Sequence, residues 1–258
     1  MHLILTGATG LVGSGVLDAM IKMKDITKIS IISRRPVQMA NDAKDPRINV
    51  IIHDDFMSYP QPLLDRLSDA TGCVWALGIS QMQVGKEEYI EITKDYTLAA
   101  AKAFQNLPST LESKDGEKPA FHFVFVSGAG TTHTPGRFTS LYARVKGETE
   151  LLLAEMRKAN PRFDAVSVRP AAVDWKAHSA IHPYLNQGFA KEALMGALAP
   201  LRGVAAGQFS PTEPLGRFLA ECAMGRFEGR LQGGGIEEVG ATGFKVVHNA
   251  GFRRLMGL

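Results

Sequence analysis

The chain has 258 residues, which fits one large domain or two small ones and is long enough to bury a full hydrophobic core. Apolar residues make up 45% and charged residues 21%, a composition that excludes a disordered or fibrous protein. The 29 basic and 26 acidic residues leave a net charge of only +3, so nucleic acid and anionic membranes are not expected partners. The 26 glycines, about one residue in ten against an average of ~7%, are the one unusual number.

The two cysteines bear on the cellular compartment. Cys73 and Cys222 lie far apart in apolar segments, and we expect both to be buried thiols in a reducing compartment. The first expected strand begins at His2, which leaves no room for a signal peptide, and no apolar run approaches the ~20 residues that cross a bilayer. These features predict a cytoplasmic protein that does not enter a membrane.

Apolar runs of strand length alternate with segments of helical period as far as Pro170. The first helix is expected over residues 11–23, and the expected strands are residues 2–6, 29–32, 48–52, 73–77, 121–126 and 165–168. The runs are continuous rather than alternating, which is typical of strands covered on both faces. Repeated strand–helix alternation predicts an α/β fold with a doubly wound parallel sheet, the Rossmann fold.

Apolar spacing predicts two longer helices, each with one packing face. The face of the first is expected to be Tyr89, Ile92, Tyr96, Ala99 and Ala103, and that of the second Tyr142, Val145, Thr149, Leu152 and Met156. After Pro170 the alternation fades, and residues 171–210 show no obvious strand. We therefore expect a single domain over residues 1–258, in which residues 171–258 are mostly a small C-terminal region that covers the substrate.

Three glycines, Gly7, Gly10 and Gly13, are spaced three apart between the first strand and the first helix. A dinucleotide-binding turn needs a tight bend at the first glycine, close backbone approach to a pyrophosphate at the second, and close helix packing at the third. The helix that follows offers unpaired N–H groups to phosphate oxygens. The residues expected to bind the cofactor here are Gly7, Thr9, Gly10, Leu11, Val12 and Gly13.

The ends of the second and third strands bear on the identity of the cofactor. Arg34 and Arg35 follow the second strand, where a carboxylate would hydrogen-bond the ribose of NAD. Guanidinium groups suit a 2′-phosphate instead, so the expected cofactor is NADP. Asp55 and Phe56, after the third strand, are expected at the adenine edge, with an acidic surface turn as the alternative. Leu77 and Gly78, after the fourth strand, are also expected at the cofactor.

Tyr142 and Lys146 are four residues apart and therefore lie on one face of the second long helix. A nearby cation, together with a positively charged nicotinamide ring, would lower the pKa of the tyrosine enough for acid–base work at neutral pH. Ser127 stands at the end of the strand that precedes this helix.

These motifs resemble those of the short-chain dehydrogenase/reductase superfamily over residues 2–170. The chain is most similar to the atypical branch, which includes TIP30-like and NmrA-like proteins. The resemblance implies NADP binding, with Tyr142 as proton donor and Lys146 holding the nicotinamide ribose while lowering the tyrosine pKa. It also implies that Pro170 and the backbone through Val173 face the nicotinamide.

One position departs from the family pattern. The serine that polarises the substrate carbonyl usually stands second in a small-hydroxyl pair, where this chain has Gly128 after Ser127. Thr131 or Thr132 could supply the missing hydroxyl, or Ser127 could do so after a shift. Hydride transfer therefore follows less directly from the sequence than cofactor binding does.

Residues beyond Pro170 are candidates for the substrate pocket. Strand ends of this kind bind ligands in such folds, so we expect a pocket lined by Trp175, His178, Tyr184 and Phe189, with ordinary core packing as an equal alternative. Asp174, His178 and His182 have a spacing that suits a metal, but nothing in the sequence completes a ligand set, and no metal is predicted.

The sequence thus predicts an NADP-dependent oxidoreductase that transfers hydride between NADPH and a carbonyl or activated alkene of a small organic molecule. The alternatives are a cofactor-sensing regulatory or interaction protein with little or no catalysis, and a sugar-nucleotide epimerase or dehydratase, which the short C-terminal region disfavours. The partner is expected to be a small-molecule substrate, and the chain a monomer or a homodimer.

Overall fold

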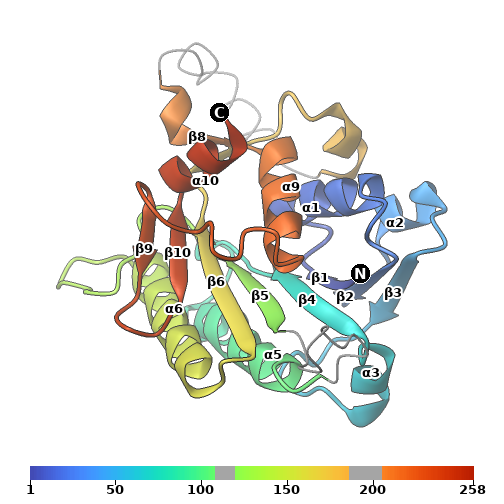
Figure 1. Cartoon of the computed structure of the whole chain (residues 1–258), viewed down its shortest axis with the longest axis horizontal. Coiled ribbons are helices and arrows are strands. Elements are labelled where there is room, and N and C mark those ends of the chain that lie inside the picture. Colours follow the sequence, from blue (N-terminus) through green and yellow to red (C-terminus); the bar gives the residue numbers. More distant parts are fainter. Residues whose placement is uncertain (108–119, 186–204) are drawn as a thin grey trace.

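The computed structural model describes residues 1–107, 120–185 and 205–258 (Figure 1). Its main sheet has the strand order β3-β2-β1-β4-β5-β6-β10-β9. All neighbouring pairs are parallel except the pair of β9 with β10. The strands are β1 (His2–Thr6), β2 (Lys28–Ser33), β3 (Ile48–Ile52), β4 (Ala70–Trp75), β5 (Phe121–Val126), β6 (Phe163–Arg169), β9 (Ile236–Glu238) and β10 (Lys245–His248). This confirms the predicted doubly wound α/β fold.

Helices cover both faces of the sheet (Figure 1). One face carries α1 (Leu11–Lys22), α2 (Gln38–Ala43), α9 (Thr212–Ala223) and α10 (Asn249–Met256). The other carries α3 (Gln61–Arg66), α5 (Tyr96–Phe104) and α6 (Leu141–Ala159). In β1, Leu3 and Leu5 pack into the first layer and Ile4 into the second, which is why the strand is apolar throughout. Strand order reverses between β1 and β4, and ligands of such sheets bind at the carboxyl ends of the strands near that point.

The first predicted helix face is interrupted by a wide helical turn. Residues Glu91–Asp95 form a π-helical turn between α4 (Lys86–Ile90) and α5. Such a turn inserts an extra residue and rotates the helix that follows. Tyr89 and Ile92 are buried as expected, but beyond the turn the buried set is Thr97, Ala100, Ala101 and Phe104 rather than Tyr96, Ala99 and Ala103. On α6, Leu153 is buried and the predicted Leu152 is exposed.

The expectation of no strand over residues 171–210 is wrong. Strand β7 (Ala172–Asp174) pairs in parallel with β8 (Phe209–Pro211) to form a separate two-stranded sheet. Of the remaining residues, α9 packs against α1, and β10 extends the main sheet next to β6. Residues 212–258 thus belong largely to the main layers of the fold.

Two smaller predictions concern the thiols and membrane association. Cys73 and Cys222 are free and buried, and burial raises the pKa of both thiols well above its usual value. Among the helices that the structure describes, none combines the length and apolar character needed to cross a bilayer.

Candidate cofactor site and active site

The loop between β1 and α1 has the backbone geometry that its glycines predict. Gly7 has a φ of +69°, and a Cβ there would lie 2.3 Å from the carbonyl oxygen of Ala76. A Cβ on Gly13 would lie 2.0 Å from the carbonyl oxygen of Gly7. Gly10 N donates to that same oxygen at 2.9 Å and closes the turn. Side chains at these positions would collide with backbone, so the turn requires glycine.

The helix that follows this turn begins without a side-chain cap. Gly10 is the N-cap residue of α1 and offers no side-chain acceptor. The first N–H groups of α1 also have no acceptor within the helix, which makes its N-terminus suited to phosphate oxygens. Thr9, Leu11 and Val12 are half-buried around the same turn. At the neighbouring β4 end, Leu77 N donates to the Thr6 hydroxyl at 3.3 Å, and Gly78 is exposed.

Arg34 and Arg35 follow β2 at the same edge of the sheet. Both are exposed, and no carboxylate of the described residues lies within ion-pair distance of either guanidinium. Asp55 is exposed and accepts a hydrogen bond from Met57 N at 3.1 Å. Burial raises the pKa of Tyr96, and the charge of the nearby Arg34 opposes that rise. Two unpaired guanidinium groups thus stand where a 2′-phosphate is expected.

Phe56 lies differently from the expectation. Its side chain is 1% exposed and stacks on Tyr96, with ring centres 5.8 Å apart, and it makes an edge-to-face contact with Trp75. A ring held in this way cannot also lie against an adenine, so only the backbone of Phe56 is available to a cofactor.

Tyr142 and Lys146 lie one turn apart on α6, as predicted. Lys146 Nζ is 5.6 Å from the centre of the Tyr142 ring, and it donates to the carbonyl oxygens of Val126 and Ser127 at 3.0 and 2.9 Å. These bonds enclose the ammonium at the end of β5, and burial lowers the pKa of Lys146 to about 8. Burial raises the pKa of Tyr142, against the smaller opposing effect of a hydrogen bond with Thr131. In the chain alone, burial therefore raises the pKa of Tyr142, which is opposite to the lowering that was expected.

The Tyr142 hydroxyl occupies the space beside Gly128. A Cβ on Gly128 would lie only 1.9 Å from Tyr142 Oη, which donates to the carbonyl oxygen of Ala129 at 3.3 Å. Ser127 Oγ lies 3.2 Å from Thr131 Oγ1. Thr132 is turned away, since its hydroxyl accepts from Thr134 N at 3.2 Å. The Ser127 and Thr131 hydroxyls thus pair with each other at the end of β5, whereas the Thr132 hydroxyl bonds the backbone of its own loop.

A cavity of about 510 Å³ opens beside Tyr142 at the carboxyl ends of β5 and β6. Its described walls carry no charged side chain and consist of Ala129, Tyr142, Pro170, Ala171, Ala172, Ala205, Gln208 and Phe209. Pro170 lines it as expected, and Val173 is half-buried in the adjoining strand β7. Of the other predicted pocket residues, Trp175 is buried in the core and Tyr184 packs against it, while Phe189 lies outside the described residues.

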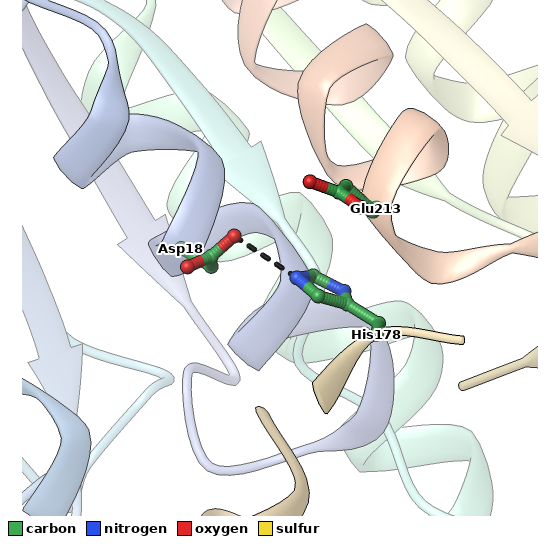
Figure 2. Close-up of side chains that lie close together, drawn as sticks. All are labelled: Asp18, His178 and Glu213. Atoms are coloured by element: carbon green, nitrogen blue, oxygen red, sulfur yellow. Dashed lines mark hydrogen bonds and ion pairs between the residues drawn. The ribbon is translucent and has the colours of Figure 1, made fainter. Parts of the chain in front are cut away.

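His178 belongs to a buried polar cluster rather than to the cavity (Figure 2). Its Nε2 is 2.9 Å from Asp18 Oδ2 on α1, and its Nδ1 is 3.0 Å from the Thr212 hydroxyl at the start of α9. Asp18, His178 and Glu213 bring ligand atoms within 4.8 Å of one another. The ammonium of Lys22 already lies 2.7 Å from Asp18 and 3.3 Å from Glu213, so the cluster has its own cation.

The spacing of Asp174, His178 and His182 does not produce a common site. His182 Nε2 is 3.0 Å from the carbonyl oxygen of Trp175, at the base of the turn Ser179–Tyr184, and His178 points toward α1 (Figure 2). His178 therefore ties the segment after β7 to α1 and α9.

Comparison with known sequences identifies fungal relatives, although no family model matches the chain. The chain is 47% identical to "Botcinic acid biosynthesis cluster B protein 16" of Botryotinia fuckeliana over 163 residues, which is 62% of this chain and 98% of that protein. It is 34% identical to "Leucinostatins biosynthesis cluster protein T" of Purpureocillium lilacinum over 78% of this chain and 76% of that protein. "Protein fmp52, mitochondrial" of Emericella nidulans is 26% identical over 99% of this chain and 89% of that protein.

Solved structures share the fold at low sequence identity. An aldohexose dehydrogenase from Thermoplasma acidophilum has a TM-score of 0.64 at 13% identity over 96% of this chain and 91% of that one. A UDP-N-acetylglucosamine 4-epimerase from Methanobrevibacter ruminantium has a TM-score of 0.60 at 17% identity over 86% and 73%. Likeness at this level shows the fold alone. The chain therefore belongs to one family with the two fungal biosynthesis-cluster proteins, and it shares its fold with solved dehydrogenases and an epimerase.

Proposed function

We propose that the chain is an NADP-dependent oxidoreductase that transfers hydride between NADPH and a carbonyl or activated alkene of a small organic molecule. The observation that carries the proposal is the position of the Tyr142 hydroxyl. Tyr142 lines a cavity at the carboxyl end of β5 whose described walls carry no charged side chain, and the glycine turn after β1 lies along the same edge of the sheet. Cofactor and substrate sites that meet at one strand edge are the arrangement that such a transfer needs.

The residues present fit a dinucleotide with a 2′-phosphate. The turn after β1 leaves a cradle that Cβ atoms would fill, and the uncapped N-terminus of α1 would hold the pyrophosphate. Arg34 and Arg35 would pair with the 2′-phosphate, and Lys146 would hold the nicotinamide ribose. NADPH, when bound, supplies the hydride.

The chain itself supplies the proton and the substrate environment. Tyr142 keeps its proton at neutral pH, because burial raises its pKa, and it would donate that proton to the substrate oxygen as the hydride is transferred. The described cavity walls are mostly alanine, proline and phenylalanine, and Gln208 adds one amide to the phenol of Tyr142. This lining favours an uncharged, largely apolar substrate.

The same lining argues against the epimerase alternative. A nucleotide sugar carries a diphosphate, which needs cationic or multiple N–H partners, and the described walls of the cavity present neither Lys nor Arg. The regulatory alternative rested on Gly128, which stands where the family has a hydroxyl. Because Gly128 makes room for the Tyr142 hydroxyl, it supports a working tyrosine rather than the loss of one.

Turnover by purified protein tests the proposal. We expect oxidation of NADPH with a panel of uncharged ketones, aldehydes and enones, and loss of that activity by at least roughly a hundredfold in Tyr142→Phe with NADPH affinity retained. Tyr184→Phe is the matched control, since that phenol lies outside the cavity lining. No turnover with any member of the panel, or unchanged turnover in Tyr142→Phe, would refute the assignment.

Cofactor choice is tested separately by binding. We expect NADPH to bind roughly 10- to 100-fold more tightly than NADH, because a charge-assisted hydrogen bond is worth ~1.5–3 kcal/mol. The double variant Arg34→Gln, Arg35→Gln should bind the two cofactors with nearly equal affinity, and its affinity for NADH should be unchanged. Equal affinity of the unaltered protein for both cofactors would overturn the NADP assignment.

Cytoplasmic location is also part of the proposal, because the mitochondrial designation belongs to the relative fmp52 and not to this chain. Cell fractionation with an antibody against this protein decides between the two compartments.

A further inference from the structure

We propose that Ser210 and Asn249 determine the substrate specificity of this site, because together they fix the two walls of the cavity beside Tyr142. The inference rests on the proposed function and deepens it, since it says what sets the shape of the pocket that an apolar carbonyl compound would enter. Neither residue lines the cavity, so both are positioning residues that act through its walls. Three observations carry the inference: the hydrogen bonds of Ser210, those of Asn249, and the packing of α10.

The cavity walls come from two segments that lie far apart in the sequence. One wall is residues 170–172, where β6 passes into β7, and the other is formed by Ala205, Gln208 and Phe209. Strands β7 and β8 pair Ala172 with Phe209, but their two-stranded sheet is separate from the main sheet. An isolated two-stranded sheet is marginally stable at best, so the position of the walls depends on further contacts.

The hydroxyl of Ser210 connects the first wall to α10. Ser210 lies in β8 and is fully buried. Its Oγ accepts from Ala171 N at 2.9 Å and donates to Asn249 Oδ1 at 2.6 Å. A hydroxyl has a single hydrogen to donate, so these two bonds together fix its direction. Replacement by alanine would remove the partner of both groups at once.

The carboxamide of Asn249 holds the second wall. Its Nδ2 donates to the carbonyl oxygens of Gly207 at 2.7 Å and Phe209 at 3.3 Å, while its Oδ1 accepts from Ser210. Gln208 of the cavity lining lies in the chain between these two anchored carbonyls. Aspartate has the same shape as asparagine, but its second carboxylate oxygen would face the two carbonyl oxygens and repel them. The wall thus requires an amide at this position.

Asn249 is itself anchored in the main fold. It is the first residue of α10, which follows β10 directly, and β10 pairs with β6 in the main sheet. One turn further, Phe252 is fully buried against Phe218 of α9, with ring centres 5.5 Å apart. Arg253 Nη1 adds a hydrogen bond to the carbonyl oxygen of Phe209 at 3.1 Å. Helix α10, which lies beside β8 in Figure 1, therefore ties both walls to the main sheet.

Kinetics of variants of the full chain test the inference. Asn249→Asp and Ser210→Ala are each expected to raise KM for the best ketone of the panel about tenfold, with kcat and NADPH affinity changed by less than about threefold. The ratio of kcat/KM between the best and the poorest ketone should fall in both variants, because a loosened wall excludes fewer competitors. The double variant should show little more than either single change, because both changes break one network.

Ser30→Ala is the matched control for the loss of a buried hydrogen bond. Ser30 is as fully buried as Ser210, and its Oγ lies 2.8 Å from His2 Nε2, away from the cavity lining. This variant is expected to lower the melting temperature about as much as Ser210→Ala without changing KM. Arg253→Met removes one bond to the wall and should raise KM about threefold, which provides a test even if Asn249→Asp does not fold.

Two kinetic results would overturn the inference. One is a rise of KM in Ser30→Ala as large as that in Ser210→Ala, because the effect would then follow from any loss of stability. The other is an unchanged KM and an unchanged ratio of best to poorest ketone in both Ser210→Ala and Arg253→Met.

Binding of prodan, an uncharged fluorescent naphthyl ketone, tests the same walls without turnover. We expect its emission to shift to shorter wavelength on binding, and its affinity to fall about tenfold in Ser210→Ala and Asn249→Asp but not in Ser30→Ala. Ala172→Trp, which adds a large ring to the cavity lining, should abolish binding. No binding, equal affinity in all these variants, or binding that survives Ala172→Trp overturns the inference. The expected prodan results without reduction of any ketone or enone would instead count against the proposed function and support the role of Ser210 and Asn249 at the walls.

Discussion

The loops after β1 and after β5 follow strands that end at the same edge of the sheet, yet the glycines of the two loops serve different purposes. In the first loop Gly7 and Gly13 let the backbone fold on itself, and the N-terminus of α1 is left open toward a ligand. In the second, Gly128 and Gly147 leave room for atoms of the chain itself, the Tyr142 hydroxyl and the Thr132 carbonyl.

The two loops also differ in what they present to a ligand. The first presents N–H groups and has no ionisable side chain in the turn itself. The second concentrates hydroxyl groups beside Lys146 and the buried Glu150. The binding turn is therefore specified by the local backbone, whereas the proposed catalytic end is specified by contacts between β5, β6 and α6. Each can be damaged separately.

Gly13→Ala is a change that acts on the first loop alone. Its Cβ would stand 2.0 Å from Gly7 O and 2.5 Å from Gly7 C, and neither backbone atom can move like a side chain. We expect NADPH affinity to fall by roughly 10- to 100-fold, since overpacking of this kind costs ~1–3 kcal/mol. Fluorescence titration measures it, with Gly85→Ala as control because its Cβ would meet nothing within 4 Å. Wild-type affinity in Gly13→Ala would contradict the geometry of the turn.

Gly147→Ala is the corresponding change in the second loop. Its Cβ would push against the Thr132 carbonyl and displace the segment that carries Thr131. We expect unfolding free energy to fall by ~1–3 kcal/mol and kcat to fall about tenfold, with NADPH affinity near that of the unaltered chain. Urea unfolding, kinetics and cofactor titration measure the three quantities, and Gly136→Ala, whose Cβ meets only Thr139 Oγ1 at 4.0 Å, is the control. A loss of affinity larger than the loss of kcat would mean that the two loops are not separable.

Sequence alone predicted the first loop better than the second for a physical reason. The glycine spacing, the strand before it and the helix after it are all local, so they can be read along the chain. The interior strands were predicted for the same reason, because a strand buried on both faces must be apolar throughout. Residues 2–6, 48–52 and 121–126 match the observed strands at both ends.

The misplaced predictions depended on features that the spacing of residues along the chain does not show. The π turn at Glu91–Asp95 rotated a helix face that regular spacing could not anticipate, and Phe56 was drawn into the core by Trp75 and Tyr96. The short strands β7 and β8 stabilise each other across more than thirty residues of sequence. Gly128 was interpreted as a missing hydroxyl because the sequence does not show the tyrosine that lies beside it.

A pH titration distinguishes the two regions by their ionisable groups. Arg34 and Arg35 at the first region keep their charge over any practical pH range, as arginines do. Burial lowers the pKa of Lys146 at the second region from 10.5 to about 8. We therefore expect the rate of carbonyl reduction to fall about tenfold per pH unit above about 8, while the ratio of NADPH to NADH affinity stays constant. Kinetic and binding measurements between pH 7 and 10 test both parts.

The direction of stability separates this explanation from unfolding. Between about pH 8 and 10.5 the unfolded chain still protonates this lysine and the folded chain does not, so Lys146 contributes a free energy of unfolding that rises with pH. As the pH rises from about 8 to 10.5, the turnover rate should thus fall while the contribution of Lys146 to the free energy of unfolding rises. Melting temperatures of Lys146→Met and of the unaltered chain isolate this contribution. Below pH 8 the variant should melt at a higher temperature than the unaltered chain, and the difference should disappear toward pH 10.5. If the difference in melting temperature between the two proteins is constant with pH, then Lys146 does not lose its proton in this pH range. The loss of rate would then have another cause.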